Sequence, residues 1–441
     1  MPATTDPATT DAEDHPDSPQ HTATQAELSA TKRPSPRLTL VAALLGFALI
    51  TLDASVVNVA LPAIGDALGG GMTGLQWVVD AYTLAFAALM LSTGAFADRA
   101  GATRAYALGI ALFTAASVAC GLAPSLGFLI AARVVQGIAA AVVLPASLSL
   151  VRQAHTDAAA RARAVALWAA GGSVAVALGP VVGGALTTAW DWSGIFFINL
   201  PLGAVTLALL VRAPRSERRP APLDLPGQLT AVLALTALTF AVIEGGATGL
   251  VAGAFAAVAG ALFLWIESRH AHPVVPLGLF RDRAVAVAVA TGSACSVAFY
   301  GVIFVFSLFF QQVQGRSALF AGLMFLPMTG LIAVTNVLAG KLASRHGPRL
   351  PMLVGQSLAV LGLLLLLYAD TSTPALLLAF LLVPLALGCA LTVPPLTAAV
   401  MEAVPADRAG VAAGVLNSAR QVSGGLGIAA FGALTATGFS T

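Results

Sequence analysis

Long apolar stretches follow one another along nearly the whole chain, and they constrain its fold more than any other feature. Thirteen can be marked out in the 441 residues, each at least 19 residues long. About 20 apolar residues in a helix suffice to cross the hydrocarbon core of a bilayer. Charged residues make up only 10% of the chain, against about 25% in soluble domains. We therefore predict an all-α polytopic membrane protein with spans at 38–62, 76–97, 104–122, 126–151, 164–188, 193–212, 226–244, 249–267, 284–310, 317–340, 350–369, 373–399 and 410–436.

Basic residues are distributed unevenly between the two ends of these spans. If the N-terminus is cytoplasmic, 19 of the 22 Lys and Arg residues fall in inner segments, and only Arg316 falls in an outer loop. Such an excess is the usual mark of the cytoplasmic side. The sequence thus predicts a multi-pass protein of the cell membrane with its N-terminus inside. Residues 1–37 hold six acids and no apolar run, so we predict a disordered cytoplasmic tail there.

A short glycine-bracketed turn occurs twice, as GAFADRAGATR at 94–104 and as GKLASRHGPR at 340–349. Each copy joins the second and third span of a group of six, so the chain is predicted to consist of two pseudo-symmetric halves. The first half would be 38–212, the linker and two inserted spans 213–283, and the second half 284–441 with five spans, its last helix apparently missing. Repeated halves are common in secondary transporters, which bind substrate near the midplane at the repeat interface.

The repeated turn has residues suited to gating. Gly94 would let two helices approach closely, and Gly101 would adopt a positive φ. Asp98 would cap a helix or form an ion pair across the seam between the halves. The alternative is a plain solvated turn whose charges only set topology. The candidate gating residues are Gly94, Asp98, Arg99, Gly101 and Arg104 in the first copy and Gly340, Arg345 and Gly347 in the second.

The fifth span, WAAGGSVAVALGPVVGGAL at 168–186, has a face of small residues. Gly172, Ala175, Gly179 and Gly183 share one side of a helix at this spacing. Such a face permits close backbone contact between membrane helices, and Pro180 would add a bend. The alternative is generic packing of small residues.

Few ionisable residues lie inside the spans, and each is costly there and therefore a functional candidate. Asp53 and Arg133 are predicted to couple proton movement, the alternative being a static structural ion pair. Asp80 lies near an outer end, where an interfacial position explains it equally well, and Arg420 is either structural or gating. The candidate cavity residues are Asp80, Gln136, Asn417, Arg420 and Gln421, whereas Asn58 is expected to pack between helices.

Several of these motifs resemble those of the major facilitator superfamily, and specifically its 14-span drug:proton antiporter branch. GAFADRAGATR is similar to the loop motif between the second and third spans. LDASVVNVALPAI at 52–64, WVVDAYTLAFAA at 77–88 and WDWSGIFFINLPLGA at 190–204 resemble motifs of the branch. The sequence GPVVGG resembles a motif of the exporters in this superfamily, which implies an export role for Gly179, Pro180, Gly183 and Gly184.

The resemblance implies a proton-coupled exporter of small apolar or amphipathic compounds that works by alternating access. Its partners would be a small-molecule substrate, protons and the lipid bilayer, and we expect a monomer. The sequence has no nucleotide-binding loop, metal-ligand cluster or nucleophile constellation, so we expect no cofactor, no metal, no nucleic acid and no enzymatic activity. The alternatives are a proton-coupled uptake symporter and a non-transporting membrane sensor. The branch would place a fourteenth span after residue 436, so either the chain is cut short or it works without that helix.

Overall fold

The computed structural model describes residues 35–155, 157–211, 216, 224–270, 273–405 and 409–438. Most of the predicted tail and most of the linker after residue 211 lie outside these ranges. Within the described residues every regular element is a helix and none is a strand, which confirms the predicted all-α class. Each of the thirteen predicted spans coincides with one helix or with consecutive helices.

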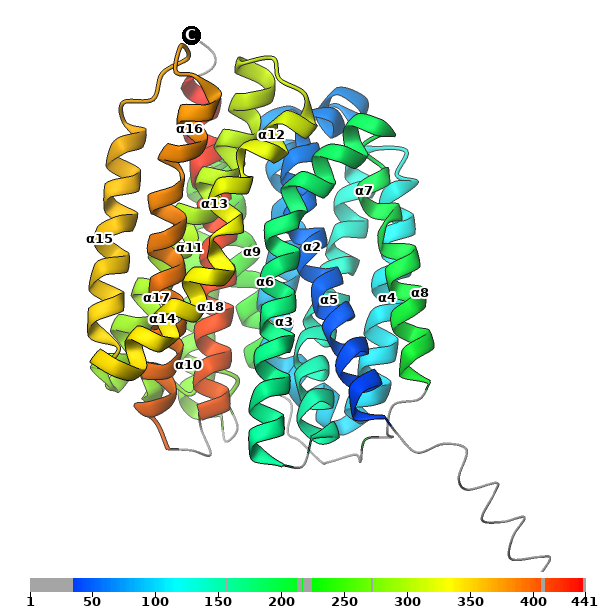
Figure 1. Ribbon diagram of the computed structural model, residues 1–441, viewed down its shortest axis with the longest axis vertical. Coiled ribbons are helices and arrows are strands. Elements are labelled where there is room, and N and C mark those ends of the chain that lie inside the picture. The colour runs from blue at the N-terminus through cyan, green and yellow to red at the C-terminus, as the bar shows by residue number, and fades with distance from the viewer. Residues whose placement is uncertain are drawn as a thin grey trace, which may run out of the picture.

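One group of helices packs together on the right of Figure 1. Within it α2 packs on α5, α6 and α8, while α5 also packs on α3 and α4. Its members are α2 (Pro36–Leu68), α3 (Gly71–Ala100), α4 (Ala102–Gly121), α5 (Leu126–Ala154), α6 (Ala158–Ala189), α7 (Gly194–Phe197) and α8 (Asn199–Leu210).

A second group lies on the left of Figure 1. Here α11 packs on α17 and α18, and α17 packs on α14 and α15. Its members are η1 (Leu277–Arg281), α11 (Arg283–Leu308), the π-helical turn η2 (Phe309–Val313), α12 (Ala318–Met324), α13 (Leu326–Gly330), α14 (Ile332–His346), α15 (Arg349–Leu366), α16 (Ala375–Leu381), α17 (Val383–Glu402) and α18 (Ala409–Gly438).

Two further helices, which lie between the two groups in chain order, form a hairpin. These are α9 (Leu225–Glu244) and α10 (Gly246–Arg269), and α9 contacts both α3 and α18. Gly245 and Gly246 both have positive φ, 60° and 55°, so the chain reverses direction within two residues. The predicted pair of inserted spans therefore forms one hairpin that touches both groups.

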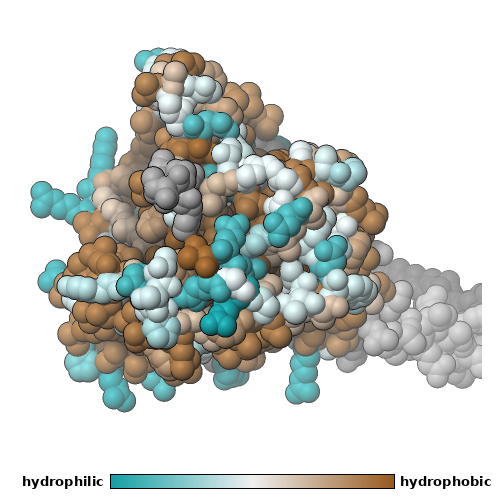
Figure 2. All heavy atoms as spheres, turned by 90° about the horizontal axis from the view of Figure 1, so that it is seen from above, coloured by the Kyte–Doolittle hydropathy of each residue, from teal (hydrophilic) through white to brown (hydrophobic). Residues whose placement is uncertain are grey.

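Apolar residues cover the sides of the bundle, as the outer helices require in a bilayer. Ten helices of the described residues are long and apolar enough to cross a membrane, or eleven if Gly71–Met90 and Ser92–Ala100 of α3 count as one span. Seen from the end that carries α12 and α16, hydrophobic residues surround a region of polar ones (Figure 2). The total of thirteen crossings stays a prediction.

The two groups meet mainly through α6 and α12, and through α3 and α18. The Leu319 backbone N–H donates to Thr188 Oγ1 at 3.1 Å, and Thr329 Oγ1 donates to the Ala177 carbonyl at 3.1 Å. On the other seam, Gln76 Nε2 donates to the Ala429 carbonyl at 2.8 Å. These contacts lie in the half of the bundle near α12, opposite the end where α2 begins.

Candidate functional site

Asp53 and Arg133 form an ion pair in the centre of the first group. Arg133 Nη1 lies 2.5 Å from Asp53 Oδ2, and both side chains are fully buried. Asp53 comes from α2 and Arg133 from α5, so the pair ties two helices together. Removing either partner would leave an uncompensated charge in a low-dielectric interior, which is strongly unfavourable.

Two amides complete the surroundings of the Asp53 carboxylate. Gln136 Nε2 donates to Asp53 Oδ1 at 3.2 Å, and Asn199 Nδ2 donates to the same oxygen at 2.8 Å. Both amides also donate to Ser117 Oγ, at 2.8 and 3.1 Å. The carboxylate thus receives donors from α5 and α8, and these donors stabilise its charged form.

Arg133 also contacts groups other than the Asp53 carboxylate. Its Nε donates to the Val78 carbonyl at 3.1 Å, and Nη1 also donates to Gln136 Oε1 at 2.9 Å. The guanidinium carbon lies 4.3 Å from the centre of the Tyr82 ring, a cation–π distance. The planar guanidinium is therefore fixed against α3 as well as α2.

Asn199, Ser117 and Tyr82 were not among the site residues predicted from the sequence. Asn199 and Tyr82 lie within the quoted motifs WDWSGIFFINLPLGA and WVVDAYTLAFAA, so the motifs themselves were the available signal. Asn58 is buried between helices as expected, and Ser307 Oγ of α11 donates to its backbone carbonyl at 2.6 Å.

Asp80 is placed differently from the interfacial position considered above. Its side chain is fully buried, and neither carboxylate oxygen has a hydrogen-bond partner among the described residues. A Cβ added to Gly425 of α18 would lie 3.2 Å from Asp80 Oδ1. Asp80 therefore faces the seam between α3 and α18, apart from the Asp53 network.

A cavity of about 170 Å³ lies between α6 and the helices of the second group. Arg420 lines it, and its Nη1 is 3.5 Å from Asn417 Oδ1. Of the other predicted cavity residues, Gln136 belongs to the Asp53 network, while Asp80, Asn417 and Gln421 do not line this cavity. Its lining residues are Ser173, Val176, Cys295, Ser296, Phe299, Tyr300, Ile332, Asn336, Ala386, Cys389, Ala390, Val393 and Arg420.

The glycine-bracketed turns have the predicted positive φ but lack the predicted close contact between helices. Gly101 and Gly347 have φ of 87° and 77°, so both turns use the left-handed region. Gly94 and Gly340 are not at close helix contacts, because a Cβ on either would meet no atom within 4 Å. The expectation of close approach at Gly94 was wrong.

The charged members of the turns project into solvent. Asp98, Arg99, Arg104 and Arg345 are exposed, and the described part of the chain contains no ion pair that involves them. The latch expected of Asp98 is thus not formed in this conformation, and its gating role stays a prediction.

The small-residue face of α6 contacts two helices at once. A Cβ on Gly179 would collide with Ser55, and one on Gly183 would lie 2.7 Å from the Val56 carbonyl oxygen, both in α2. On the other side, a Cβ on Gly184 would lie 2.4 Å from the carbonyl oxygen of Ala318 in α12. The prediction of close backbone contact is confirmed, and the motif lies where the two helix groups meet.

Pro180 completes this contact, because a Cβ on Gly322 of α12 would collide with its carbonyl oxygen. The predicted bend at Pro180 does not interrupt α6, which runs as one helix from Ala158 to Ala189.

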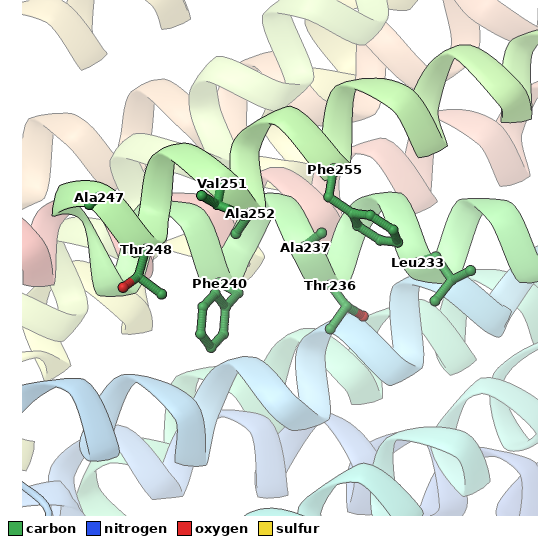
Figure 3. A pocket seen from close by; sticks show the side chains of 9 residues that line it. All are labelled: Leu233, Thr236, Ala237, Phe240, Ala247, Thr248, Val251, Ala252 and Phe255. Carbon is green, nitrogen blue, oxygen red and sulfur yellow. The ribbon is translucent and has the colours of Figure 1, made fainter.

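A larger groove lies between α9 and α10 (Figure 3), but it has no ionisable side chain. Its lining is Leu233, Thr236, Ala237, Phe240, Ala247, Thr248, Val251, Ala252 and Phe255. Such a surface suits lipid acyl chains and offers no group that could bind a proton.

A bundle of apolar helices in two groups, with a buried ion pair and a cavity at the seam, is the architecture of a secondary transporter. The sequence profile of the Major Facilitator Superfamily matches residues 43–428, and the chain belongs to that superfamily. It is therefore a multi-span membrane transporter.

Two curated relatives are similar over most of their length. The multidrug resistance protein Stp of Mycobacterium tuberculosis is 41% identical over 414 residues, covering 91% of this chain and 76% of the relative. A methylenomycin A resistance protein of Streptomyces coelicolor is 38% identical, covering 88% and 83%. Among solved structures, a D-xylose-proton symporter matches with a TM-score of 0.64 at 15% identity, covering 90% of this chain and 89% of the symporter. That last likeness concerns the fold alone.

Proposed function

We propose that this chain exports small apolar or amphipathic compounds in exchange for protons, as a member of the 14-span drug:proton antiporter branch. Its relatives at 41% and 38% identity are named for multidrug resistance and for methylenomycin A resistance. The exporter-like motif GPVVGG lies at the seam where an alternating-access transporter must open and close. Asp53 would carry the proton and Arg133 would balance its charge.

The Asp53 network is the observation that carries this proposal. Protonation of Asp53 removes the negative charge that Arg133 Nη1, Gln136 Nε2 and Asn199 Nδ2 stabilise. The guanidinium would then be left buried without a counter-ion, at a cost of several kcal/mol. A rearrangement of α2 against α5 relieves this cost, so proton binding biases the helix packing.

The cavity and the network share neighbours through which such a bias can act. Tyr300 lines the cavity and also packs on the buried cluster that contains Val56 of α2 and Val78 of α3. Val78 is the residue whose carbonyl accepts from Arg133. A shift at the ion pair would therefore move a wall of the cavity.

The predicted organisation completes the proposal. Residues 38–212 and 284–441 would rock against each other about the cavity, with 213–283 between them and the N-terminus in the cytoplasm. The contacts of α6 with α12 close the end opposite the start of α2. The turns with Asp98 and Gly101 would close the other end in the alternate state, and the protein would act as a monomer.

The test is Asp53→Asn in inside-out vesicles with an acidic lumen, followed with a pH-sensitive dye and a radiolabelled neutral drug such as chloramphenicol. We expect the wild type to exchange luminal protons for drug, and the variant to insert normally and show neither flux. Asp191→Asn is the matched control, because Asp191 is an exposed loop acid whose nearest bonds are to Trp192 N and Ser193.

Drug accumulation against a gradient by Asp53→Asn would contradict the assignment. Proton-driven accumulation of drug in right-side-out vesicles would instead favour the uptake symporter.

A further inference from the structure

Two arginines of the described residues lie inside predicted spans, Arg133 fully buried and Arg420 half-buried, and their surroundings differ. Arg133 has a carboxylate at 2.5 Å, an amide oxygen at 2.9 Å and a backbone carbonyl at 3.1 Å. Arg420 has only Asn417 Oδ1, at 3.5 Å, and its Nε is buried without a partner among the described residues. Within the part of the chain that the structure describes, Arg133 therefore has a carboxylate partner and Arg420 has none.

No acid of the described residues forms an ion pair with Arg420. None of the residues that line its cavity is Asp or Glu, and the described part of the chain contains no ion pair to Arg420. A guanidinium cannot lose its proton in a protein. Inside a membrane protein an uncompensated cation is expensive, and such residues mark substrate pathways.

The helices around Arg420 accommodate its side chain and direct it to the cavity. A Cβ on Gly292 of α11 would lie 3.2 Å from both Cγ and Cδ of Arg420, so the glycine leaves room for the stem. The cavity wall also holds hydrogen-bonding groups from three other helices, namely Ser173 of α6, Asn336 of α14 and Ser296 of α11. These are suited to the remaining lone pairs of an oxyanion.

We propose that this cavity binds organic acids, with the anionic head of the substrate on Arg420 and its apolar body against Phe299, Ile332 and Val393. Guanidinium groups recognise carboxylates and similar oxyanions through paired hydrogen bonds. The volume of about 170 Å³ suits an aromatic ring with a small head, because a cavity of roughly 150 Å³ holds benzene. The proposal refines the substrate class of the exporter proposed above.

The test compares three ligands that share a phenyl ring and differ in the charge of a small head group, on the purified full-length wild type. Binding of carbon-14-labelled benzoate, methyl benzoate and benzylammonium is measured by equilibrium dialysis at neutral pH without any gradient. We expect benzoate to bind at least about tenfold more tightly than the ester, since hydrogen bonds to charged groups are the strong ones. Benzylammonium should bind least. Equal binding of all three, or a preference for the cation, would overturn the proposal.

Variants then locate the anion site. Arg420→Gln should lower benzoate binding to the level of the ester and leave ester binding unchanged, and Arg420→Lys should retain part of the preference. Arg316→Gln is the matched control, because it removes one arginine charge outside the cavity, where Arg316 lies over the Phe320 ring. An unchanged benzoate preference in Arg420→Gln would refute the role of Arg420.

These measurements separate this proposal from the exporter proposal. Benzoate selectivity in a protein that fails to exchange drug for protons would sustain the anion site and reject the exporter. Export of the neutral drug by a protein that shows no anion preference would sustain the exporter and reject the anion site.

Discussion

At the scale of single residues, Asp53 and Arg133 show how much of the site composition alone could predict. A carboxylate and a guanidinium inside apolar spans are rare enough that each predicts a partner. The structure places these two at 2.5 Å. Asn199 and Ser117 are neutral polar residues, which are common in membrane helices, so only the fold reveals that they complete the carboxylate's surroundings.

Arg133 gives the sharpest prediction at this scale. Arg133→Ala leaves Asp53 buried and unpaired, which should destabilise the protein by about 3–5 kcal/mol and abolish transport. Arg133→Lys keeps the charge but loses the planar contact with Tyr82 and the bond from Nε to Val78, so transport should be only partly restored. Thermal melting in detergent and drug efflux from cells would measure both.

Arg152→Ala is the control for this pair of variants, since Arg152 is exposed in the last turn of α5. Normal efflux by Arg133→Ala would show that the ion pair has no part in transport.

At the scale of helices, the glycines of α6 and of the first turn differ in what they contact. The spacing of glycines along the fifth span correctly predicted a close-packing face, because helical periodicity fixes which residues share a side. Gly94 has no such contact, because a sequence does not show whether a neighbouring helix lies opposite a given glycine. The sequence could not decide between the two positions considered for Asp80 for a similar reason, since its burial depends on α18, far away in the chain.

Gly184 and Gly94 make a matched pair for testing this difference. In Gly184→Ala the new methyl would lie 2.4 Å from the Ala318 carbonyl oxygen, so α6 and α12 must separate. We expect lower thermal stability and slower drug efflux. Gly94→Ala meets nothing within 4 Å, and alanine favours helix by about 1 kcal/mol over glycine, so it should be neutral or slightly stabilising.

Equal melting temperatures and equal efflux rates in these two variants would show that the α6–α12 contact does not control opening of that end.

At the scale of the whole molecule, the predicted class and the helices at all thirteen stretches followed from apolar length, which is a local property. The central cavity did not, because α6, α11, α14, α17 and α18 all contribute to it. Arg420 was recognised as unusual from sequence, yet only the assembled helices show that no described residue forms an ion pair with it. The charge of Arg420, and the substrate anion that it would bind, decide how the transporter should respond to membrane potential.

An exporter that releases an organic anion while one proton enters moves two positive charge equivalents inward per cycle. A potential of 100 mV, inside negative, contributes about 2.3 kcal/mol per charge, so both movements are driven in the direction of export. In inside-out proteoliposomes without a pH gradient, a potassium diffusion potential set with valinomycin, lumen positive, should therefore drive labelled benzenesulfonate into the lumen. The neutral benzenesulfonamide, for which only the proton carries charge, should respond less, and Arg420→Gln should abolish the difference between the two compounds. Benzenesulfonate transport that is indifferent to the imposed potential would mean an electroneutral cycle and would contradict anion–proton exchange.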